Sequence, residues 1–436
     1  MEVLENKSRF HPKYKYSMIE GESAELSKRK KLSNLIREVT HFVPYYKQFL
    51  ESTDTYDDPV QALARLPITE KALLHNHAEQ FYSERIDKSR REDLLIAEVT
   101  TGSSGLPIMC YKTKEERFQL ALSAWKQRRA IDARVNQSNL FCLLHSHSSQ
   151  KKVVDNMRNL HSQNISKVLH YLRDEFKPLI IHCSPSDIFE YAKFIEREHF
   201  SLEDWELGFI ETNSEVLTLE QKQKISQRFR TRVINNYGCR EAWNIAYECR
   251  EGNLHLSDEV HVEIIDMKTG DLIQPGSSDY GEVVITALPI KHFPFIRYRL
   301  GDIGRLSRLE CACGLENEVL ELYEARKINL IHRLTNDNTL TNGVSLFKGV
   351  FSDLVASGYS DVVQNIIRYK IIQTSTDVFD VYLMLHEALT ERLTESFTHY
   401  ATLRIGEGAV FNFLQKSADD PVFEGKNYSF LSRIQG

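Results

Sequence analysis

The feature that most constrains the fold is a regular alternation of short apolar runs with helix-length segments between about residues 94 and 236. Strand-length apolar runs lie at 94–100, 139–145, 177–182, 205–210 and 232–236. Amphipathic segments separate them, two of which begin with capping boxes at Thr113/Glu116 and Thr218/Gln221. Parallel strands need crossovers of this length, so the pattern predicts an α/β fold with mainly parallel sheets flanked by helices.

The pattern changes on both sides of this region. Residues 23–50 predict a helical cap, whereas the segment after Gly238 has short strands and turn signals typical of a small, barrel-like β subdomain. Alternation resumes from about residue 326. We therefore expect a large N-terminal domain over 1–325 and a small, mobile α+β C-terminal domain over 326–436.

Composition excludes several classes of partner. The 436 residues include 55 Lys+Arg against 61 Asp+Glu, a net charge of −6 that leaves no basic footprint for nucleic acid. No apolar run approaches the roughly 20 residues of a membrane helix. The first residues lack the apolar core of a signal peptide, so we expect a cytoplasmic protein with reduced thiols. A homodimer is one option that the sequence leaves open.

A loop rich in glycine and hydroxyl residues follows the first predicted strand, at 100–107. Its backbone N–H groups could converge on an anion, because Gly102 and Gly105 permit the positive φ values that an anion nest requires. It is not a Walker A loop, since no Gly-Lys-Ser/Thr closes it. A simple hairpin loop is an equally good interpretation. The candidate phosphate ligands are Thr101, Gly102, Ser103, Ser104 and Gly105.

Two further motifs follow predicted strands. In Asn235–Glu241, Tyr237 is placed to stack on a base and Glu241 to bind a hard divalent ion. In Ile296–Asp302, Asp302 could accept hydrogen bonds from a ribose diol, with Arg299 near phosphate charge. For the first motif the alternative is an ordinary strand end with a solvated surface glutamate, and for the second it is an Arg/Asp surface pair at a turn.

In combination, these motifs resemble the adenylate-forming superfamily of acyl-CoA synthetases, and within it the phenylacetate-CoA ligase-like branch that includes capsule-biosynthesis ligases of the CapK type. Further matching segments are 66–71 (LPITEK), 246–249 (AYEC), 280–282 (YGE) and 293–294 (FP). The resemblance extends over nearly the whole chain.

The resemblance implies a nucleotide site. The loop from Thr101 to Gly105 would cradle the β- and γ-phosphates of ATP, and Tyr237 would stack on adenine with Gly238 beside it. Glu241 would bind Mg²⁺, and Asp302 would hold the ribose hydroxyls.

The resemblance also implies a junction between the two domains and a catalytic lysine. Arg326 and Asn329 resemble the basic residue and the hinge between the domains, and Lys426, in the segment 425–430, resembles the catalytic lysine. The implied reaction is ATP- and Mg²⁺-dependent formation of an acyl- or aryl-adenylate from a small-molecule carboxylate, with pyrophosphate released and the acyl group passed to coenzyme A.

Three positions depart from the family pattern. Ile108 replaces the usual lysine after the loop, Arg240 replaces a threonine before the metal-binding acid, and Ala325 replaces the hinge glycine. Two alternatives therefore stay open: transfer to a carrier-protein thiol or an amine, and a non-catalytic, nucleotide-binding, zinc-stabilised scaffold.

Four soft or borderline ligands suggest a metal site. Cys249 and His255 are six residues apart, and Cys311 and Cys313 are followed by Gly314, whose flexibility allows a tight turn around sulfur. The spacing is not that of a standard zinc finger. The resemblance favours structural Zn²⁺ at these residues, beside the ATP site.

Overall fold

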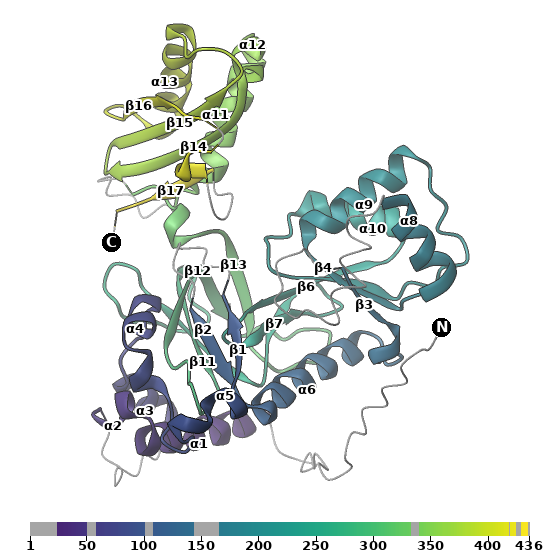
Figure 1. The fold of residues 1–436 in the computed structure, drawn as a ribbon, viewed down its shortest axis with the longest axis vertical. Coiled ribbons are helices and arrows are strands. Elements are labelled where there is room, and N and C mark those ends of the chain that lie inside the picture. Colours follow the sequence, from purple (N-terminus) through teal and green to yellow (C-terminus); the bar gives the residue numbers. More distant parts are fainter. Residues whose placement is uncertain are drawn as a thin grey trace.

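The computed structural model describes residues 24–49, 58–100, 108–143, 165–332, 340–417, 419–423 and 429–434. A long sheet with its helices forms the larger, lower part of Figure 1, and the C-terminal elements form a smaller group above it. None of the helices in the described segments is long and apolar enough to cross a membrane.

Eleven strands form one mixed sheet in the order β10-β9-β11-β12-β13-β8-β7-β6-β5-β4-β3. Its strands are β3 (Leu140–Leu143), β4 (Ile180–Cys183), β5 (Phe209–Thr212), β6 (Arg232–Cys239), β7 (Trp243–Glu248), β8 (Leu254–Leu256), β9 (Val260–Ile265), β10 (Leu272–Ile273), β11 (Gly281–Ala287), β12 (Tyr298–Ser307) and β13 (Val319–Arg326). Strands β3 to β6 pair in parallel, and the remaining neighbours are antiparallel.

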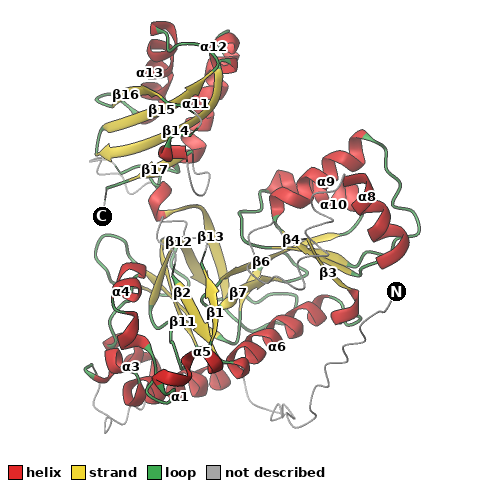
Figure 2. Cartoon of the chain, in the orientation of Figure 1, coloured by secondary structure: helices red, strands yellow, loops and turns green. Residues whose placement is uncertain are grey.

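The parallel part has helices on both faces, as predicted for an α/β fold. Its helices are α6 (Lys114–Ile131), α8 (Ile165–His170), α9 (Pro185–Arg197) and α10 (Leu219–Phe229), which are red in Figure 2. Ile181 and Ile210 pack toward α8, α9 and α10, whereas Ile180 and Phe209 share a second core with Trp125 of α6. Consecutive strand residues thus point to opposite, buried faces. The fold class is confirmed.

The antiparallel strands predicted as a barrel-like subdomain continue this same sheet. The N-terminal helices share its largest core, in which Leu35 and Phe81 pack with Ile285 and Phe295. The helices that contribute to this core are α1 (Ala24–Phe42), α2 (Pro44–Lys47), α3 (Pro59–Arg65) and α4 (Lys71–Asn76), whereas α5 (Arg91–Leu94), which follows them, buries no residue. A separate hairpin of β1 (Ile96–Val99) and β2 (Met109–Lys112) lies beside them (Figure 1).

The C-terminal elements have a sheet and a core of their own. The sheet order is β16-β15-β14-β17, with strands β14 (Ile366–Ser375), β15 (Val378–Leu385), β16 (Val410–Gln415) and β17 (Phe430–Ser432). The helices are α11 (Gly343–Ala356), α12 (Ser360–Gln364) and α13 (Glu391–Ile405). Phe347, Phe397 and Phe430 meet in their core. The boundary predicted at 325/326 falls at the last residues of β13.

Candidate active site

The end of β6 carries Tyr237, the residue predicted to stack on adenine, and the turn from β6 to β7 carries Glu241, the predicted metal ligand. A Cβ atom added at Gly238 would lie 1.7 Å from the carbonyl oxygen of Trp243, so no larger residue fits there. Trp243 itself has a φ of +60°, a region that side-chain-bearing residues rarely occupy. Glu241 is therefore held in a turn whose two flanks are both conformationally restricted.

Tyr237 near the end of β6, Asp302 in the middle of β12 and Arg326 at the end of β13 meet in one place. The Tyr237 hydroxyl donates a hydrogen bond of 2.8 Å to Oδ2 of Asp302. Asp302 lies opposite Arg326 in the β12–β13 ladder, and Oδ1 of Asp302 is 2.6 Å from Nε of Arg326. Burial, and then the Asp302 carboxylate, raise the pKa of Tyr237 well above its usual value, so this hydroxyl stays a donor. Three residues predicted from distant motifs thus form one connected group.

Glu241 lies in a buried polar environment near this group. Its side chain is largely buried and accepts a hydrogen bond from Tyr298, whose pKa is raised by burial first and by Glu241 next. Lys71, the first residue of α4, is half-buried and close enough to Glu241 and Arg326 for both to affect its pKa. Burial lowers the pKa of Lys71, and Glu241 partly opposes that shift.

Lys71 is a candidate site residue that the motif analysis missed. A parallel bridge between Thr69 and Tyr298 fixes the segment before it against β12. The sequence did contain one indication that Lys71 has a role. The helix dipole disfavours a lysine in the first turn of a helix, so a lysine there calls for another explanation. A cation at this position is better explained by an anionic neighbour such as Glu241.

Arg299 does not point its charge at Asp302. Its guanidinium pairs with Glu70 at 3.0 Å and with Glu282 at 3.5 Å. Two glutamates therefore pair with Arg299, instead of the Asp302 of the alternative interpretation, and its proposed contact with phosphate stays a prediction.

Asn329, the predicted hinge, connects the junction to the last strand. Its buried side chain donates a hydrogen bond of 2.7 Å from Nδ2 to the carbonyl oxygen of Phe430 in β17. The Phe430 ring stacks on Phe347, and a Cβ at Gly343 would lie 2.2 Å from it. The junction is thereby attached to the core of the C-terminal elements, while its role as a pivot stays a prediction.

Two predicted groups lie outside the described residues: the loop residues Thr101, Gly102, Ser103, Ser104 and Gly105, and Lys426. The described residues that flank the loop are joined across its base. Thr100 donates its N–H to the Ile108 carbonyl at 2.9 Å, and Ile108 donates its N–H to Oγ1 of Thr100 at 3.0 Å. The contact of the loop with the β- and γ-phosphates of ATP stays a prediction, and so does the catalytic role of Lys426.

The four predicted metal ligands gather in one place. The ligand atoms of Cys249, His255, Cys311 and Cys313 all lie within 4.8 Å of one another. The sulfur atoms of Cys249 and Cys311 are 3.8 Å apart, which is the edge of a tetrahedron whose metal–sulfur bonds are about 2.3 Å long. The donor set and its spacing therefore fit Zn²⁺.

The surroundings of this cluster also suit a metal. His255 directs Nδ1 to the carbonyl oxygen of Asn317 at 2.9 Å, which leaves Nε2 facing Cys313. The backbone N–H of Cys313 and the side chain of Asn253 lower the pKa of Cys311, which favours the thiolate that binds metal, whereas burial raises the pKa of Cys313. Gly314, at a φ of +81°, makes the tight turn after the two cysteines.

A second buried charged group lies in the parallel part of the sheet. The Glu211 side chain is fully buried and bonds Arg128 through two short contacts of 2.7 and 2.8 Å. His182, Tyr247 and Asn236 also direct polar atoms at it. Burial alone would raise the pKa of Glu211, but Arg128 and then His182 outweigh it and hold that pKa well below 4.5. The contacts show a structural network that joins β4, β5, β6, β7 and α6.

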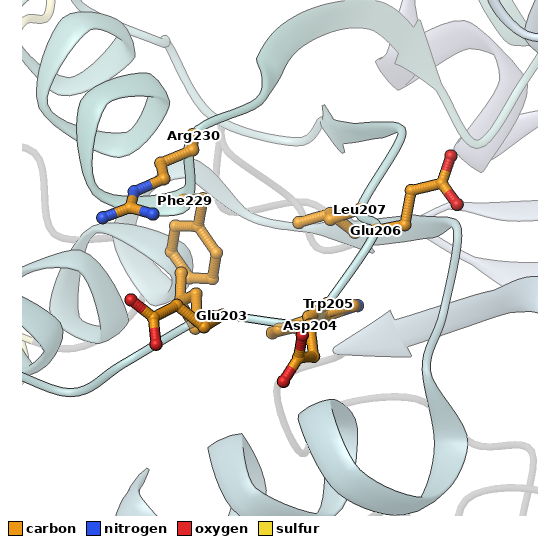
Figure 3. Close-up of a pocket in the computed structure, with 8 residues that line it drawn as sticks. Glu203, Asp204, Trp205, Glu206, Leu207, Phe229 and Arg230 are labelled. Atoms are coloured by element: carbon orange, nitrogen blue, oxygen red, sulfur yellow. The ribbon is translucent and has the colours of Figure 1, made fainter.

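A surface cavity of about 560 Å³ lies away from these groups (Figure 3). It is lined by residues 202–207, which precede β5, and by Phe229 and Arg230, which precede β6. It therefore opens at the amino edge of the parallel strands, whereas ligands of open α/β sheets bind at the carboxyl edge. We do not assign the candidate site to it.

The known proteins that are similar to this chain come from the group of ligases that its motifs resemble. No family model matches the chain. It is 26% identical over 280 residues to a phenylacetate-coenzyme A ligase of Pseudomonas putida, covering 61% of this chain and 62% of that ligase. It is 22% identical over 242 residues to the protein CapK of Staphylococcus aureus, covering 55% and 49%.

A solved structure of 2-hydroxyisobutyryl-CoA ligase, in the postadenylation state and in complex with R3-HIB-AMP, has a similar fold. The TM-score is 0.62 at 14% identity, and the match covers 94% of this chain and 90% of that one. The chain spans less than two thirds of the length of the curated relatives named above.

Proposed function

Because the chain is a relative of the adenylate-forming, acyl-CoA synthetase-like ligases, we propose that it uses ATP to activate a carboxylic acid. A carboxylate oxygen attacks the α-phosphorus of ATP, the bond from that phosphorus to the β-phosphate oxygen breaks, and pyrophosphate leaves. The acyl-adenylate then reacts with the thiol of coenzyme A, which releases AMP and a proton.

The chemistry explains why the site needs cations. An anionic nucleophile approaches an anionic phosphate, so negative charge accumulates in the transition state. Because water is excluded from the site, positive groups of the protein must stabilise that charge. We assign this task to Lys426, with the loop Thr101 to Gly105 receiving the pyrophosphate. Lys71 adds a cation near Glu241 and Arg326.

Mg²⁺ fits the donor chemistry at Glu241. Magnesium in nucleotide sites takes one or two carboxylate ligands together with phosphate oxygens and water. Glu241 offers one buried carboxylate, held beside Tyr298 and Lys71. When bound there, the metal would neutralise phosphate charge.

One observation carries the proposal above the others: Tyr237 of β6, Asp302 of β12 and Arg326 of β13 are joined into one hydrogen-bonded group, from motifs about 65 and 24 residues apart. An aromatic ring next to a carboxylate provides a base-stacking surface and an acceptor for ribose hydroxyls. The carboxylate keeps 17% of its side-chain surface exposed, so a ligand can reach it.

Exchange of labelled pyrophosphate into ATP tests the proposal. We expect exchange that depends on an added carboxylic acid, measured side by side with aromatic, fatty and amino acids. Phenylacetate comes first in the panel because a relative bears that name. An absence of exchange over the panel, in protein that binds ATP, would leave the non-catalytic scaffold as the better interpretation.

The acceptor is decided by a second measurement. If exchange occurs and coenzyme A is consumed with formation of a thioester, the protein is an acid–CoA ligase. If exchange occurs and coenzyme A is never acylated, transfer to a carrier-protein thiol or an amine replaces that assignment.

We also propose that Cys249, His255, Cys311 and Cys313 bind one structural Zn²⁺. The cluster joins β8 to the turn before β13 and to the residue after β7. It lies at the ends of β7 and β13 that are opposite to Trp243 and Arg326, so a bound ion would fix these strands away from the proposed ATP site and not, as the sequence had suggested, beside it. Removal of such an ion would lower the stability of the folded protein, because the ion binds the folded chain and the site does not exist in the unfolded chain.

The zinc proposal predicts about one Zn²⁺ per chain in protein purified without chelator. We expect Cys311→Ser to lower the zinc content toward zero and to lower the melting temperature. Cys142→Ser, at a cysteine outside the cluster, should keep the full zinc content. Elemental analysis checks both variants, and a wild-type protein without zinc would refute the site.

We further propose that residues 326–436 move as a domain about Asn329. Their own sheet and core support this, as does the bond from Asn329 to β17.

A further inference from the structure

A buried ion pair lies in the β1–β2 hairpin beside the candidate site. Lys112 is fully buried, and its Nζ is 3.0 Å from Oε2 of Glu98, which is itself largely buried. Arg117 adds a second cation, with its Nε 3.2 Å from Oε1 of Glu98. A fully buried lysine is rare, because an ion loses its hydration there, and the function proposed above makes no use of it.

Lys112 also contacts the turn that carries Glu241. Its Nζ donates a hydrogen bond of 2.7 Å to the carbonyl oxygen of Arg240. That carbonyl belongs to the peptide bond directly before Glu241. The lysine therefore fixes the backbone on the amino side of the proposed metal ligand.

Glu98 holds the other side of the same turn. Its Oε2 accepts a hydrogen bond of 3.0 Å from Nε1 of Trp243, two residues after Glu241. Trp243 is the residue with the unfavourable φ of +60°, and Arg117 lies over its ring at 5.5 Å. One buried ion pair thus contacts the turn on both sides of Glu241.

We propose that Lys112 and Glu98 are positioning residues for Glu241, which set its carboxylate for the divalent cation of the nucleotide complex. This inference rests on the proposed function. Outer residues that orient a metal ligand typically change metal affinity by about 10- to 100-fold when they are replaced. A pair with a purely structural role would change stability and leave metal affinity unaltered.

The main variant replaces both charges, Lys112→Met with Glu98→Gln. It leaves no unpaired charge from this pair, and the amide oxygen that the second substitution introduces can still accept the Trp243 N–H. The matched control is Lys31→Met with Glu259→Gln. Lys31 likewise contacts one carboxylate, Glu259 at 2.6 Å, and one carbonyl oxygen, that of Asp258 at 3.3 Å.

The measured quantity is the affinity of the protein for Mn²⁺ when it is saturated with α,β-methylene-ATP. The paramagnetic resonance signal gives the concentration of free Mn²⁺. A sample of the analogue without protein provides the reference. We expect the double variant to bind Mn²⁺ at least about tenfold more weakly, and the control variant to match wild type. In pyrophosphate exchange, the Mg²⁺ concentration for half-maximal rate should rise by a similar factor while the KM for the acid is unchanged.

A third variant keeps the test decisive if the double variant does not fold. Trp243→Phe removes only the N–H that bonds Glu98 and keeps an aromatic ring in place. It should weaken Mn²⁺ binding in the same direction. Unaltered Mn²⁺ affinity in the folded variants, with normal binding by wild type, would overturn the positioning role and leave the proposed function standing. Absence of Mn²⁺ binding by nucleotide-saturated wild type would overturn the metal part of the proposed function, and the positioning role with it.

Discussion

Replacement of Lys426 by alanine is expected to slow carboxylate-dependent pyrophosphate exchange by about 10²- to 10³-fold, the usual effect of removing one group that stabilises transition-state charge. The lysine is proposed to meet charge that develops on the α-phosphate and the incoming carboxylate. Because it contributes most in the transition state, the rate should fall much more than ATP affinity. Exchange kinetics and direct ATP binding measure the two effects.

Lys416→Ala provides the matched control in the same C-terminal part of the chain. Lys416 pairs at 3.1 Å with Asp420 at the surface, and its loss should leave exchange within about twofold of wild type. Normal exchange by the Lys426 variant would remove that residue from the proposed mechanism, and another cation such as Lys71 would have to take its place.

Replacement of Arg128 by methionine is expected to destabilise the fold by about 3–5 kcal/mol, since it leaves the fully buried Glu211 without its main cation. Urea unfolding at pH 7 measures the loss. The double variant Arg128→Met with Glu211→Gln should recover part of it, because no buried charge then lacks a partner. Arg404→Met, at an exposed pair with Asp353, should cost less than about 1 kcal/mol.

The same network predicts a pH dependence. The pKa of Glu211 in the folded protein lies well below its usual value of 4.5, so its stabilising effect is complete above about pH 4.5 and is lost as the pH falls below that value. In the Arg128 variant, burial raises the pKa of Glu211 and the acid takes up a proton more readily. The difference in stability between wild type and this variant should therefore shrink between pH 7 and pH 4. A difference that stays constant over this range would show that Glu211 is not the group responsible.

Local sequence patterns predicted the elements well, because caps and periodicity are short-range. Capping boxes at Thr113 and Thr218 do begin α6 and α10. Strand ends were less well predicted: the run at 205–210 begins its strand only at Phe209, and the run at 177–182 only at Ile180. Pairing with neighbouring strands, which no short window contains, decides such ends.

The site was predicted in part. Motifs indicated Tyr237, Asp302 and Arg326, and the structure brings them together. Neither Lys71 nor Lys112 received a role. The sequence distinguished Lys71 only by its unfavourable place in the first turn of a helix, and Lys112 is an ordinary lysine until its neighbours are known. Their significance lies in burial and in partners far away in sequence, Glu241 for the first and the Arg240 carbonyl for the second.

The sequence by itself determined the alternation that makes this an α/β chain, the residue types of a proposed nucleotide site, and four ligands suited to zinc. Each of these is set by local chemistry: side-chain periodicity, backbone freedom at glycine, and the preference of a soft metal for sulfur and imidazole. Only the tertiary structure decided that the antiparallel strands extend the parallel sheet and that Cys249 lies 3.8 Å from Cys311. It alone also decided that one buried ion pair contacts the turn of Glu241 on both sides. The reason is physical: burial and long-range pairing change the energy of a charge or a thiol, and both depend on residues that are remote in the chain.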